Sequence, residues 1–407
     1  MAPLVVLAIT ATLASAQSLP LASPADAFQH VIVLSQQIGP RPSGTPAFAR
    51  TGEYIATELA RLGYRVEREG FPFPFFDETQ PPTLTILGPT RVDLHPLTLV
   101  YSAPSQRDGV QGLIESAGLG REEDLRGKHF EGRIALIARG QLLLRDKVAT
   151  LAAAGATAAI IYNDRPGAIQ LGTLLQLSQI PAVFISLEEG RRLLDDLQGG
   201  PVRVRLVVNT VVGQRMTQNI VGIKLGTRTP TEIVVVGAHA DSVKVSPGAN
   251  DNGSGVAAVL EAARLLAQIP MARTVHFVAF GAEEDGLHGS HFYILGHRQT
   301  VVGMVNLDMV ARGAGLLVGN QGNDASMVDL AERVARRLGL SVRRFKSGQS
   351  DHISFEQAGV PAVFITTGDD EAIHTPGDVA DRLDPALVAT AATLAASTVQ
   401  ELANSVR

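Results

Sequence analysis

The 407-residue chain contains no cysteine. A disulfide framework, a thiolate metal site and a cysteine nucleophile are therefore all excluded. Charge is scarce as well, since charged residues make up 18% of the chain and the formal net charge is −5. This balance favours neither a nucleic-acid partner nor a basic membrane-binding surface. At this length we expect two domains, each able to bury a sizeable core.

Long hydrophobic runs are also missing. Residues 4–13 form an apolar run too short to span a bilayer, and Ala14-Ser15-Ala16 after it is an A-x-A cleavage pattern. These features predict a signal peptide over residues 1–16, even though its first residues carry no Lys or Arg. The mature chain would then begin near Gln17 and be secreted or periplasmic. No other stretch suggests a membrane span.

Helix signals are present at the start of the mature chain. Ser23-Pro24 is an N-cap followed by proline at the first helical position, and it predicts a helix toward residue 38. The segment GPRPSG at residues 39–44 ends that helix, and a second helix is expected over residues 47–62. The segment FPFPFF at residues 71–76 is interpreted as a loop packed against the core, with a substrate-pocket lining as the alternative.

From about residue 90 to residue 212 the composition changes. Short β-like runs recur there, and one helical segment is expected over residues 143–154, ending at Gly155. The region holds few candidate catalytic groups, because His95 and His129 are isolated.

After residue 218 strand-like and helix-like segments alternate. Apolar runs at residues 233–236, 274–280, 304–307 and 360–366 are typical of strands, and a helix is expected over residues 253–268. Alternation of this kind predicts an α/β fold, with a mainly parallel sheet covered by helices on both faces.

Polar side chains follow three of these strands. His239 and Asp241, then Glu283-Glu284, then Asp308 each stand at or just after a strand end, and Asp251 lies in the loop GANDNGSG at residues 248–255. Loops from the carboxyl ends of parallel strands converge at one edge of an open sheet. A histidine and several carboxylates delivered to that edge predict a metal site.

A pair of zinc ions needs nitrogen and oxygen ligands, one carboxylate that bridges both ions, and an open position for water. His239 can supply nitrogen to one ion, and His374 to the other. Asp251, in a loop of small residues, can approach both ions. Asp308 and one of Glu283 and Glu284 complete the shells, and the other glutamate stays free as a general base. The residues alone leave open which glutamate does which, and cobalt or manganese would also fit.

The motifs AHADS (238–242), GANDNGSG (248–255), GAEE (281–284), NLD (306–308) and HTPGD (374–378) resemble peptidase family M28, the co-catalytic zinc aminopeptidases. The resemblance implies His239, Asp251 and Asp308 on one ion, and Asp251, Glu284 and His374 on the other. It further implies Glu283 as general base, a cis peptide bond after Asp251, and a zinc-exopeptidase fold. Asp241 would orient the His239 imidazole as a hydrogen-bond acceptor.

Residues 125–186 resemble a protease-associated (PA) domain, a small β-rich insert. The expected organisation is a signal peptide at 1–16, the first part of the peptidase domain at 17–89, the insert at 90–212, and the catalytic domain at 213–407.

Other histidines near the motifs have alternative interpretations. His276 is expected to be a packed core residue, whereas His288 and His291 could compete as ligands. The segment SDH at residues 350–352 receives no firm role.

The function favoured is a secreted aminopeptidase that hydrolyses peptide substrates with two zinc ions. The alternatives are a carboxypeptidase or dipeptidase of this fold, a single-zinc acyl transferase of the glutaminyl cyclase type, and a non-enzymatic scaffold. A carboxypeptidase needs a cation for the terminal carboxylate. Candidate cations near the motifs are Arg312, Arg343, Arg344 and Lys346, whereas the motifs themselves carry almost only acidic groups, which favours the aminopeptidase.

Overall fold

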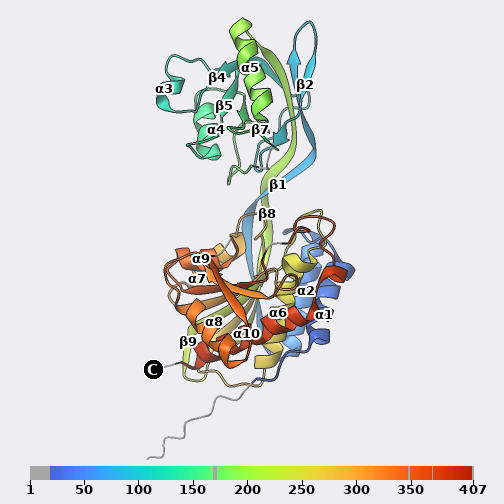
Figure 1. Cartoon of the computed structure of the whole chain (residues 1–407), viewed down its shortest axis with the longest axis vertical. Coiled ribbons are helices and arrows are strands. Elements are labelled where there is room, and N and C mark those ends of the chain that lie inside the picture. Colours follow the sequence, from blue (N-terminus) through green and yellow to red (C-terminus); the bar gives the residue numbers. More distant parts are fainter. Residues whose placement is uncertain (1–18, 168–171, 347–348, 369, 406–407) are drawn as a thin grey trace, which may run out of the picture. The chain divides into compact units, whose positions relative to one another are not determined.

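The computed structural model describes residues 19–167, 172–346, 349–368 and 370–405 (Figure 1). It divides into two compact units, Met1–Phe71 with Gln218–Arg407, and Pro72–Thr217. We call the first the larger unit and the second the insert. The predicted signal peptide lies outside the described residues and stays a prediction.

The larger unit is built on a mixed sheet with strand order β13-β12-β14-β11-β9-β10-β8. Neighbours are parallel except at β12/β14 and β8/β10, so the sheet is mainly parallel as predicted. Its strands are β8 (Arg203–Lys224), β9 (Thr229–His239), β10 (Arg273–Phe280), β11 (Val301–Leu307), β12 (Leu316–Asn320), β13 (Val342–Lys346) and β14 (Ala362–Thr366).

Helices cover both faces of this sheet. Val234 and Val236 of β9 point into one hydrophobic core, while Val235 between them points into the other. The first core holds α1 (Pro24–Ile32), α2 (Pro46–Arg61), α6 (Gly255–Leu266), α8 (Ser326–Arg337) and α10 (Pro385–Asn404), and the second holds α7 (His288–His297) and α9 (His352–Gln357). Two-sided burial explains why the central strands are apolar throughout.

Proline-containing caps start three of the helices on the first face. The side chains of Ser23, Thr45 and Asp384 cap α1, α2 and α10, each with proline at the next position. The helical turns of η1 (Val33–Ile38) continue α1, and the short segments η2 (Ala249–Ser254) and η3 (Ala380–Arg382) lie near the loops described below.

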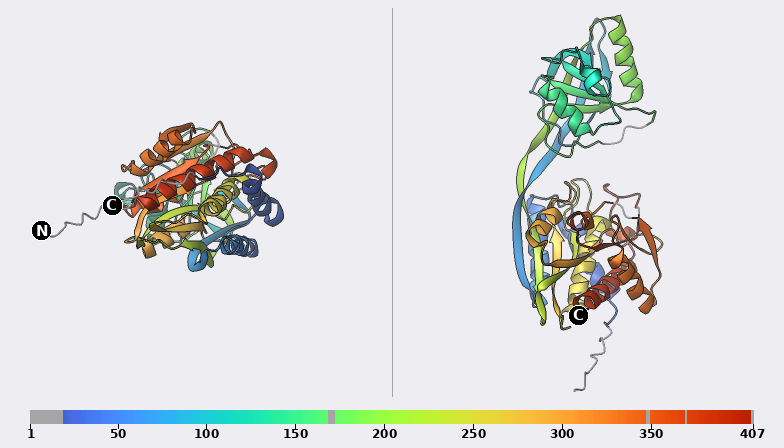
Figure 2. Two further views of the ribbon diagram at one scale, coloured as in Figure 1. Left: turned by 90° about the horizontal axis from the view of Figure 1, so that it is seen from below. Right: turned by 90° about the vertical axis from the view of Figure 1, so that its left-hand side faces the viewer.

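Helix α10 is long and apolar enough to cross a membrane by length and composition. Its most apolar window is 67% buried inside the fold, and it packs against α1 and α6 (Figure 2). Small alanines allow this close approach, so α10 is a core helix of the larger unit.

In the insert the strand order continues from β8 as β8-β4-β5-β6-β7-β3. Its elements are β2 (Val92–Leu94), β3 (Leu97–Thr98), β4 (Val110–Ser116), α3 (Glu122–Leu125), β5 (Ile134–Ala138), α4 (Leu144–Ala153), β6 (Ala158–Tyr162), β7 (Ala182–Ile185) and α5 (Leu187–Gly199). The expectation of a single helical segment is wrong, because α5 is a full helix. The signal was present, since Ser186 and Glu189 form a capping box that starts it.

The loop expected at residues 71–76 is also wrong, because strand β1 (Arg65–Leu87) runs through it. Phe71 and Phe73 are buried, and Pro72 and Pro74 alternate with them. Prolines two residues apart remove N–H donors from the same edge of a strand, so the other edge stays free to pair. β1 pairs with β8 and β2.

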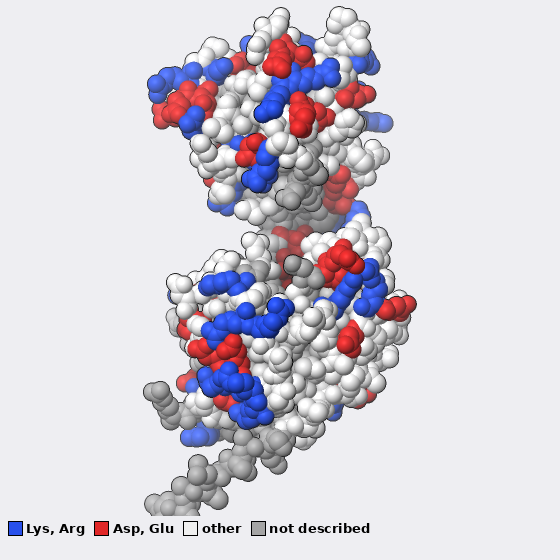
Figure 3. Space-filling view, in the orientation of Figure 1, with Lys and Arg blue, Asp and Glu red and all other residues white. Residues whose placement is uncertain are grey.

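Because β1 and β8 are long, the insert's compact unit begins at Pro72 and ends at Thr217, wider than the 90–212 expected from composition. On the face shown in Figure 3, acidic and basic side chains are interspersed on both units. Arg344, for example, pairs with Asp329 and Glu332.

Candidate metal centre

The candidate ligands lie at the carboxyl edge of the larger unit's sheet. His239 is the last residue of β9, Asp308 directly follows β11, and Glu283 and Glu284 follow β10. His374 lies in the loop after β14, and Asp251 lies in η2. The connections after β9, β10, β11 and β14 thus meet at the edge of the sheet where parallel strands bring their carboxyl ends together.

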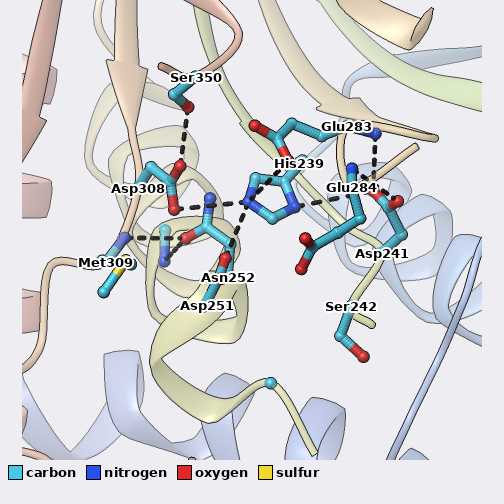
Figure 4. A network of polar contacts seen from close by, with 12 residues as sticks. His239, Asp241, Ser242, Asp251, Asn252, Glu283, Glu284, Asp308, Met309 and Ser350 are labelled. Atoms are coloured by element: carbon cyan, nitrogen blue, oxygen red, sulfur yellow. Dashed lines mark hydrogen bonds and ion pairs between the residues drawn. The ribbon is translucent and has the colours of Figure 1, made fainter. Parts of the chain in front are cut away.

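Asp251 lies between the two histidines. Its Oδ1 is 3.1 Å from Nε2 of His239, and its Oδ2 is 3.1 Å from Nε2 of His374. The His239 Nε2 is also 3.4 Å from Asp308 Oδ1, and the His374 Nε2 is 3.0 Å from Glu284 Oε2 (Figure 4 shows the His239 side). All five predicted ligands therefore converge, with one carboxylate offering an oxygen to each histidine.

Exposure differs sharply across the centre. The His239 side chain is 1% exposed, whereas the His374 side chain is 52% exposed. The centre is therefore closed on the His239 side, and it is accessible to a solvent-borne molecule on the His374 side.

The charges of the centre compensate one another strongly. Burial alone would lower the pKa of His239, but Glu283 and Asp308 outweigh it and raise that pKa well above its usual value. Hydrogen bonds that the imidazole donates to Asp251 and Glu284 raise the pKa of His374 to about 10. Burial raises the pKa of Glu284 to about 7 and that of Glu283 still more clearly. A positive charge placed between these carboxylates would therefore stabilise their ionised forms.

The residues fit divalent metal ions. There are two groups of residues whose ligand atoms all lie within 4.8 Å of one another inside the group. They are His239/Glu283/Asp308 and His239/Asp251/Glu284. Glu284 Oε1 and Asp308 Oδ1 are buried and receive no hydrogen bond in the structure. Imidazole nitrogens with carboxylate oxygens form a donor set that suits zinc. Because Glu283 Oε2 is 4.0 Å from His239 Nε2, distance alone does not separate base from ligand.

The Asp251 loop is held by residues whose part the sequence did not reveal. Asp378, the last residue of the HTPGD motif, accepts hydrogen bonds from the N–H groups of Asn250 (2.7 Å) and Asp251 (3.1 Å). The Asn252 side chain accepts from Gly255 N–H at 2.8 Å and donates to the Leu307 carbonyl at 2.9 Å. The Asp251–Asn252 peptide bond is cis, as the resemblance implied.

Asp241 contacts the glutamate turn as well as the histidine. Its Oδ1 is 3.7 Å from His239 Nδ1, beyond hydrogen-bond distance. The same carboxylate accepts hydrogen bonds from the main-chain N–H groups of Glu283 (3.3 Å) and Glu284 (3.4 Å). In this structure Asp241 therefore positions the two glutamates by hydrogen bonds. Its contact with His239 is electrostatic, at ion-pair distance.

The SDH segment also lies at the centre. Ser350 Oγ donates to Asp308 Oδ2 at 2.7 Å, and it accepts from the Asn306 side-chain amide at 2.8 Å (Figure 4 shows the Ser350–Asp308 bond). Asp351 is fully buried, and burial raises its pKa to about 7.

The remaining histidines behave in two ways. His276 is buried on β10 and its Nδ1 lies 2.7 Å from the Tyr293 hydroxyl, so it is a core residue as predicted. Among the described residues, His288 and His291 belong to neither ligand group, so the structure gives no support to their competing as ligands.

Three of the four candidate cations are paired with groups other than the candidate ligands. Arg312 lies 2.8 Å from both Asp370 and Glu371. Arg344 pairs with Asp329 and Glu332, and Lys346 donates at 3.1 Å to the carbonyls of Gln321 and Gly322, while Arg343 is exposed on β13. Thus Arg312, Arg344 and Lys346 each already have partners.

Comparison with known proteins agrees with this geometry. Models of peptidase family M28 and of the PA domain match residues 219–399 and 97–193. Aminopeptidase YwaD of Bacillus subtilis (strain 168) is 33% identical over 394 residues, covering 92% of this chain and 84% of the relative. Two solved structures, each 31% identical, are also similar. The first, an aminopeptidase from Aneurinibacillus sp. strain AM-1, has a TM-score of 0.84, and the match covers 94% of both chains. The second, the zinc aminopeptidase BSAP from Bacillus subtilis, has a TM-score of 0.76, and the match covers 96% of this chain and 98% of that one. The chain therefore belongs to peptidase family M28 and carries an inserted PA domain.

Proposed function

We propose that this peptidase is a zinc aminopeptidase that removes N-terminal residues from peptides and binds two zinc ions per chain. The observation that carries the proposal is Asp251, whose two oxygens lie 3.1 Å from His239 and from His374. One ion would be held by His239, Asp251 and Asp308, and the other by Asp251, Glu284 and His374. The similar proteins, named as aminopeptidases and in one case as a zinc aminopeptidase, support it.

Zinc in such a site lowers the pKa of water and polarises a substrate carbonyl. Glu283 then accepts the proton of the attacking water and transfers it to the leaving amine. Burial raises the pKa of the Glu283 carboxyl, which brings it closer to the range in which a general base works at neutral pH. Asp241 holds the main chain of this glutamate, so the carboxylate keeps a defined direction.

The direction of attack follows from the charges around the centre. An aminopeptidase must hold the ammonium group of its substrate, for which nearby carboxylates suffice. A carboxypeptidase must hold a carboxylate, normally with a free arginine fork. Arg312 has both its terminal nitrogens engaged by Asp370 and Glu371, which favours the aminopeptidase.

The other candidate functions fit the residues less well. A single-zinc acyl transferase needs one ligand set, whereas His239 and Asp308 complete a second set on the other side of Asp251. A scaffold that has lost its metals is expected to lack ligands, and all five are present. Cobalt or manganese remain acceptable substitutes in such a donor set.

The proposal is tested on one purified sample by metal content and by a matched pair of peptides. We expect about two zinc ions per chain, in keeping with a two-metal site. A peptide amidated at its C-terminus should be cleaved, and the same peptide acetylated at its N-terminus should not. Release of a C-terminal residue from the acetylated peptide would overturn the direction of attack. One zinc per active chain would overturn the two-ion centre.

A further inference from the structure

The segment GPRPSG, residues 39–44, lies between η1 and α2, far in sequence from every ligand. It contains no metal ligand and no base. Nevertheless its two polar side chains are almost completely inaccessible, with Arg41 at 0% and Ser43 at 2% exposure. Each of them contacts a different loop of the centre.

Arg41 holds both ends of the loop between His239 and Asp251. Its guanidinium donates to the carbonyl oxygens of Ala240 (2.8 Å), Pro247 (2.7 Å) and Gly248 (2.8 Å). In addition, the Arg41 main-chain N–H donates to Ser242 Oγ at 3.1 Å. One side chain thus joins the residue after His239 to residues three and four positions before Asp251.

The charge of Arg41 has no direct acidic partner among the described residues, since all its side-chain bonds go to carbonyls. Burial lowers its pKa, and the negative charges of Asp241 and Asp378 act in the opposite direction. A buried charge is costly unless it is compensated and hydrogen-bonded. Two features therefore compensate the buried guanidinium, its three hydrogen bonds to carbonyl oxygens and the attraction of nearby carboxylates.

The loop is shaped around this side chain at Gly248, whose φ is 62°. A Cβ at that position would lie 2.6 Å from Ser242 Cβ and 3.1 Å from Arg41 Nη1. Only glycine permits both the left-handed conformation and the close approach of the guanidinium.

Ser43 contacts the turn that carries the glutamates. Its Oγ accepts a hydrogen bond of 2.6 Å from Ala282 N–H, and Ala282 has a φ of 55°. The preceding N–H, of Gly281, donates to Asn219 Oδ1 at 3.1 Å, and the next two donate to Asp241. Four successive N–H groups of this turn are therefore received by side chains, which fixes the origin of Glu283.

We propose that Arg41 and Ser43 are positioning residues with separable tasks, an inference that rests on the proposed function. Arg41 preorganises the metal-binding loop, so it determines how tightly the apoprotein binds zinc. Ser43 orients the turn of the general base, so it determines the turnover number once zinc is bound. The two prolines that flank Arg41 hold both side chains in one rigid segment.

The test combines zinc titration of the apoprotein with steady-state kinetics of the zinc-saturated enzyme. Arg41→Lys keeps the charge but cannot reach three carbonyls, and it should weaken zinc binding by ~10–100-fold while kcat at saturation stays close to wild type. Ser43→Ala should keep wild-type zinc affinity and lower kcat by ~10–100-fold, with KM unchanged.

Matched controls are Arg50→Lys, an exposed arginine of α2, and Ser35→Ala, a buried serine whose hydroxyl donates to the Val31 carbonyl one helical turn earlier. Neither control should change zinc affinity or kcat. Ser242→Ala removes a single acceptor of Arg41 and should weaken zinc binding less than Arg41→Lys, which keeps the test readable where Arg41→Lys fails to fold.

The inference would be overturned if Arg41→Lys and Ser43→Ala lost zinc affinity and kcat equally, in parallel with a lower melting temperature. It would also be overturned if both variants had wild-type zinc affinity and kcat. A wild-type enzyme without peptidase activity would overturn the proposed function and the task assigned to Ser43. The zinc affinities of the Arg41 and Ser242 variants would still decide the task assigned to Arg41.

Discussion

The larger unit and the insert both contain short parallel strands that are apolar and buried. In the larger unit β9 ends in His239 and β11 is followed by Asp308, both of which are buried. In the insert the corresponding positions after β5, β6 and β7 are Arg139, Asn163 and Ser186. Ser186 caps a helix, and Arg139 donates to the Asn163 side chain at 3.3 Å.

The buried charges differ in the same way. Among the insert's described residues, Lys147 is the only charged side chain that is buried, and it donates to the carbonyls of Leu119 (2.5 Å) and Ala138 (2.7 Å). The larger unit instead buries several carboxylates close together, an arrangement that is unfavourable unless a cation compensates it. The candidate metal centre therefore belongs to the larger unit, whereas the buried charge of the insert has a structural role, binding main-chain carbonyls.

The strongest test of this contrast is Glu283→Gln. The amide keeps the shape of the side chain but cannot accept a proton, so kcat should fall by ~10²–10⁴-fold while zinc content is retained. Glu284→Gln is the control and should lower zinc occupancy instead. The opposite pattern, measured by kinetics and metal analysis, would exchange the roles of the two glutamates.

Removal of the metal should affect the stability of the two units differently. Zinc at about 1,000 times its Kd stabilises a folded protein by about 4 kcal/mol. We therefore expect a chelator to speed hydrogen exchange in peptides from residues 218–405, where the carboxylates lose their compensating charge. Peptides from residues 110–200 of the insert should exchange at an unchanged rate. Equal acceleration in both units, followed by mass spectrometry, would contradict the assignment of the metal centre to the larger unit.

A smaller effect concerns a buried histidine outside the centre. Burial, with help from His297 and Arg65, lowers the pKa of His276 to about 3. Below a pH of about 6.5 the unfolded chain binds a proton that the folded chain does not, so stability falls as the pH falls toward 3. The slope contributed by this one histidine approaches, at most, about 1.4 kcal/mol per pH unit.

His276→Gln should remove this slope. Between pH 6 and pH 5 the wild type should lose about 1 kcal/mol more unfolding free energy than the variant, measured by urea denaturation of the apoprotein. The insert offers a matched control substitution in His129→Gln, at an exposed histidine. Parallel pH profiles of wild type and His276→Gln would show that the protonation of His276 is not linked to folding.

Much of the fold and of the centre could be predicted because the signals are local. Strand ends, proline caps and the loop GANDNGSG depend on neighbours within a few residues, and parallel strands bring their carboxyl ends to one edge. A shared site could thus be expected for His239, Asp251, Asp308, His374 and one of the two glutamates. The choice of Glu284 as that ligand came from the resemblance to family M28. The insert's helix α5 also begins at a local signal, the capping box formed by Ser186 and Glu189.

Other features could not be predicted because their partners are distant in the chain. The FPFPFF segment lies in strand β1, which pairs with β8 more than a hundred residues later in the chain. The hydrogen bonds of Asp241 depend on where the glutamate turn lies, and Asp378 contacts a loop about 127 residues away. Local propensity does not encode such contacts.

The sequence by itself identified the candidate ligands, since their type and spacing follow from short motifs at strand ends, but it left open which of Glu283 and Glu284 is the ligand and which is the base. Tertiary structure alone decided how those side chains are held. Arg41 lies some two hundred residues before the loop whose carbonyls it binds, and Ser43 lies 239 residues before the N–H that it accepts. A buried hydrogen bond forms wherever packing leaves a donor facing an acceptor, and only the folded chain brings these donors and acceptors together.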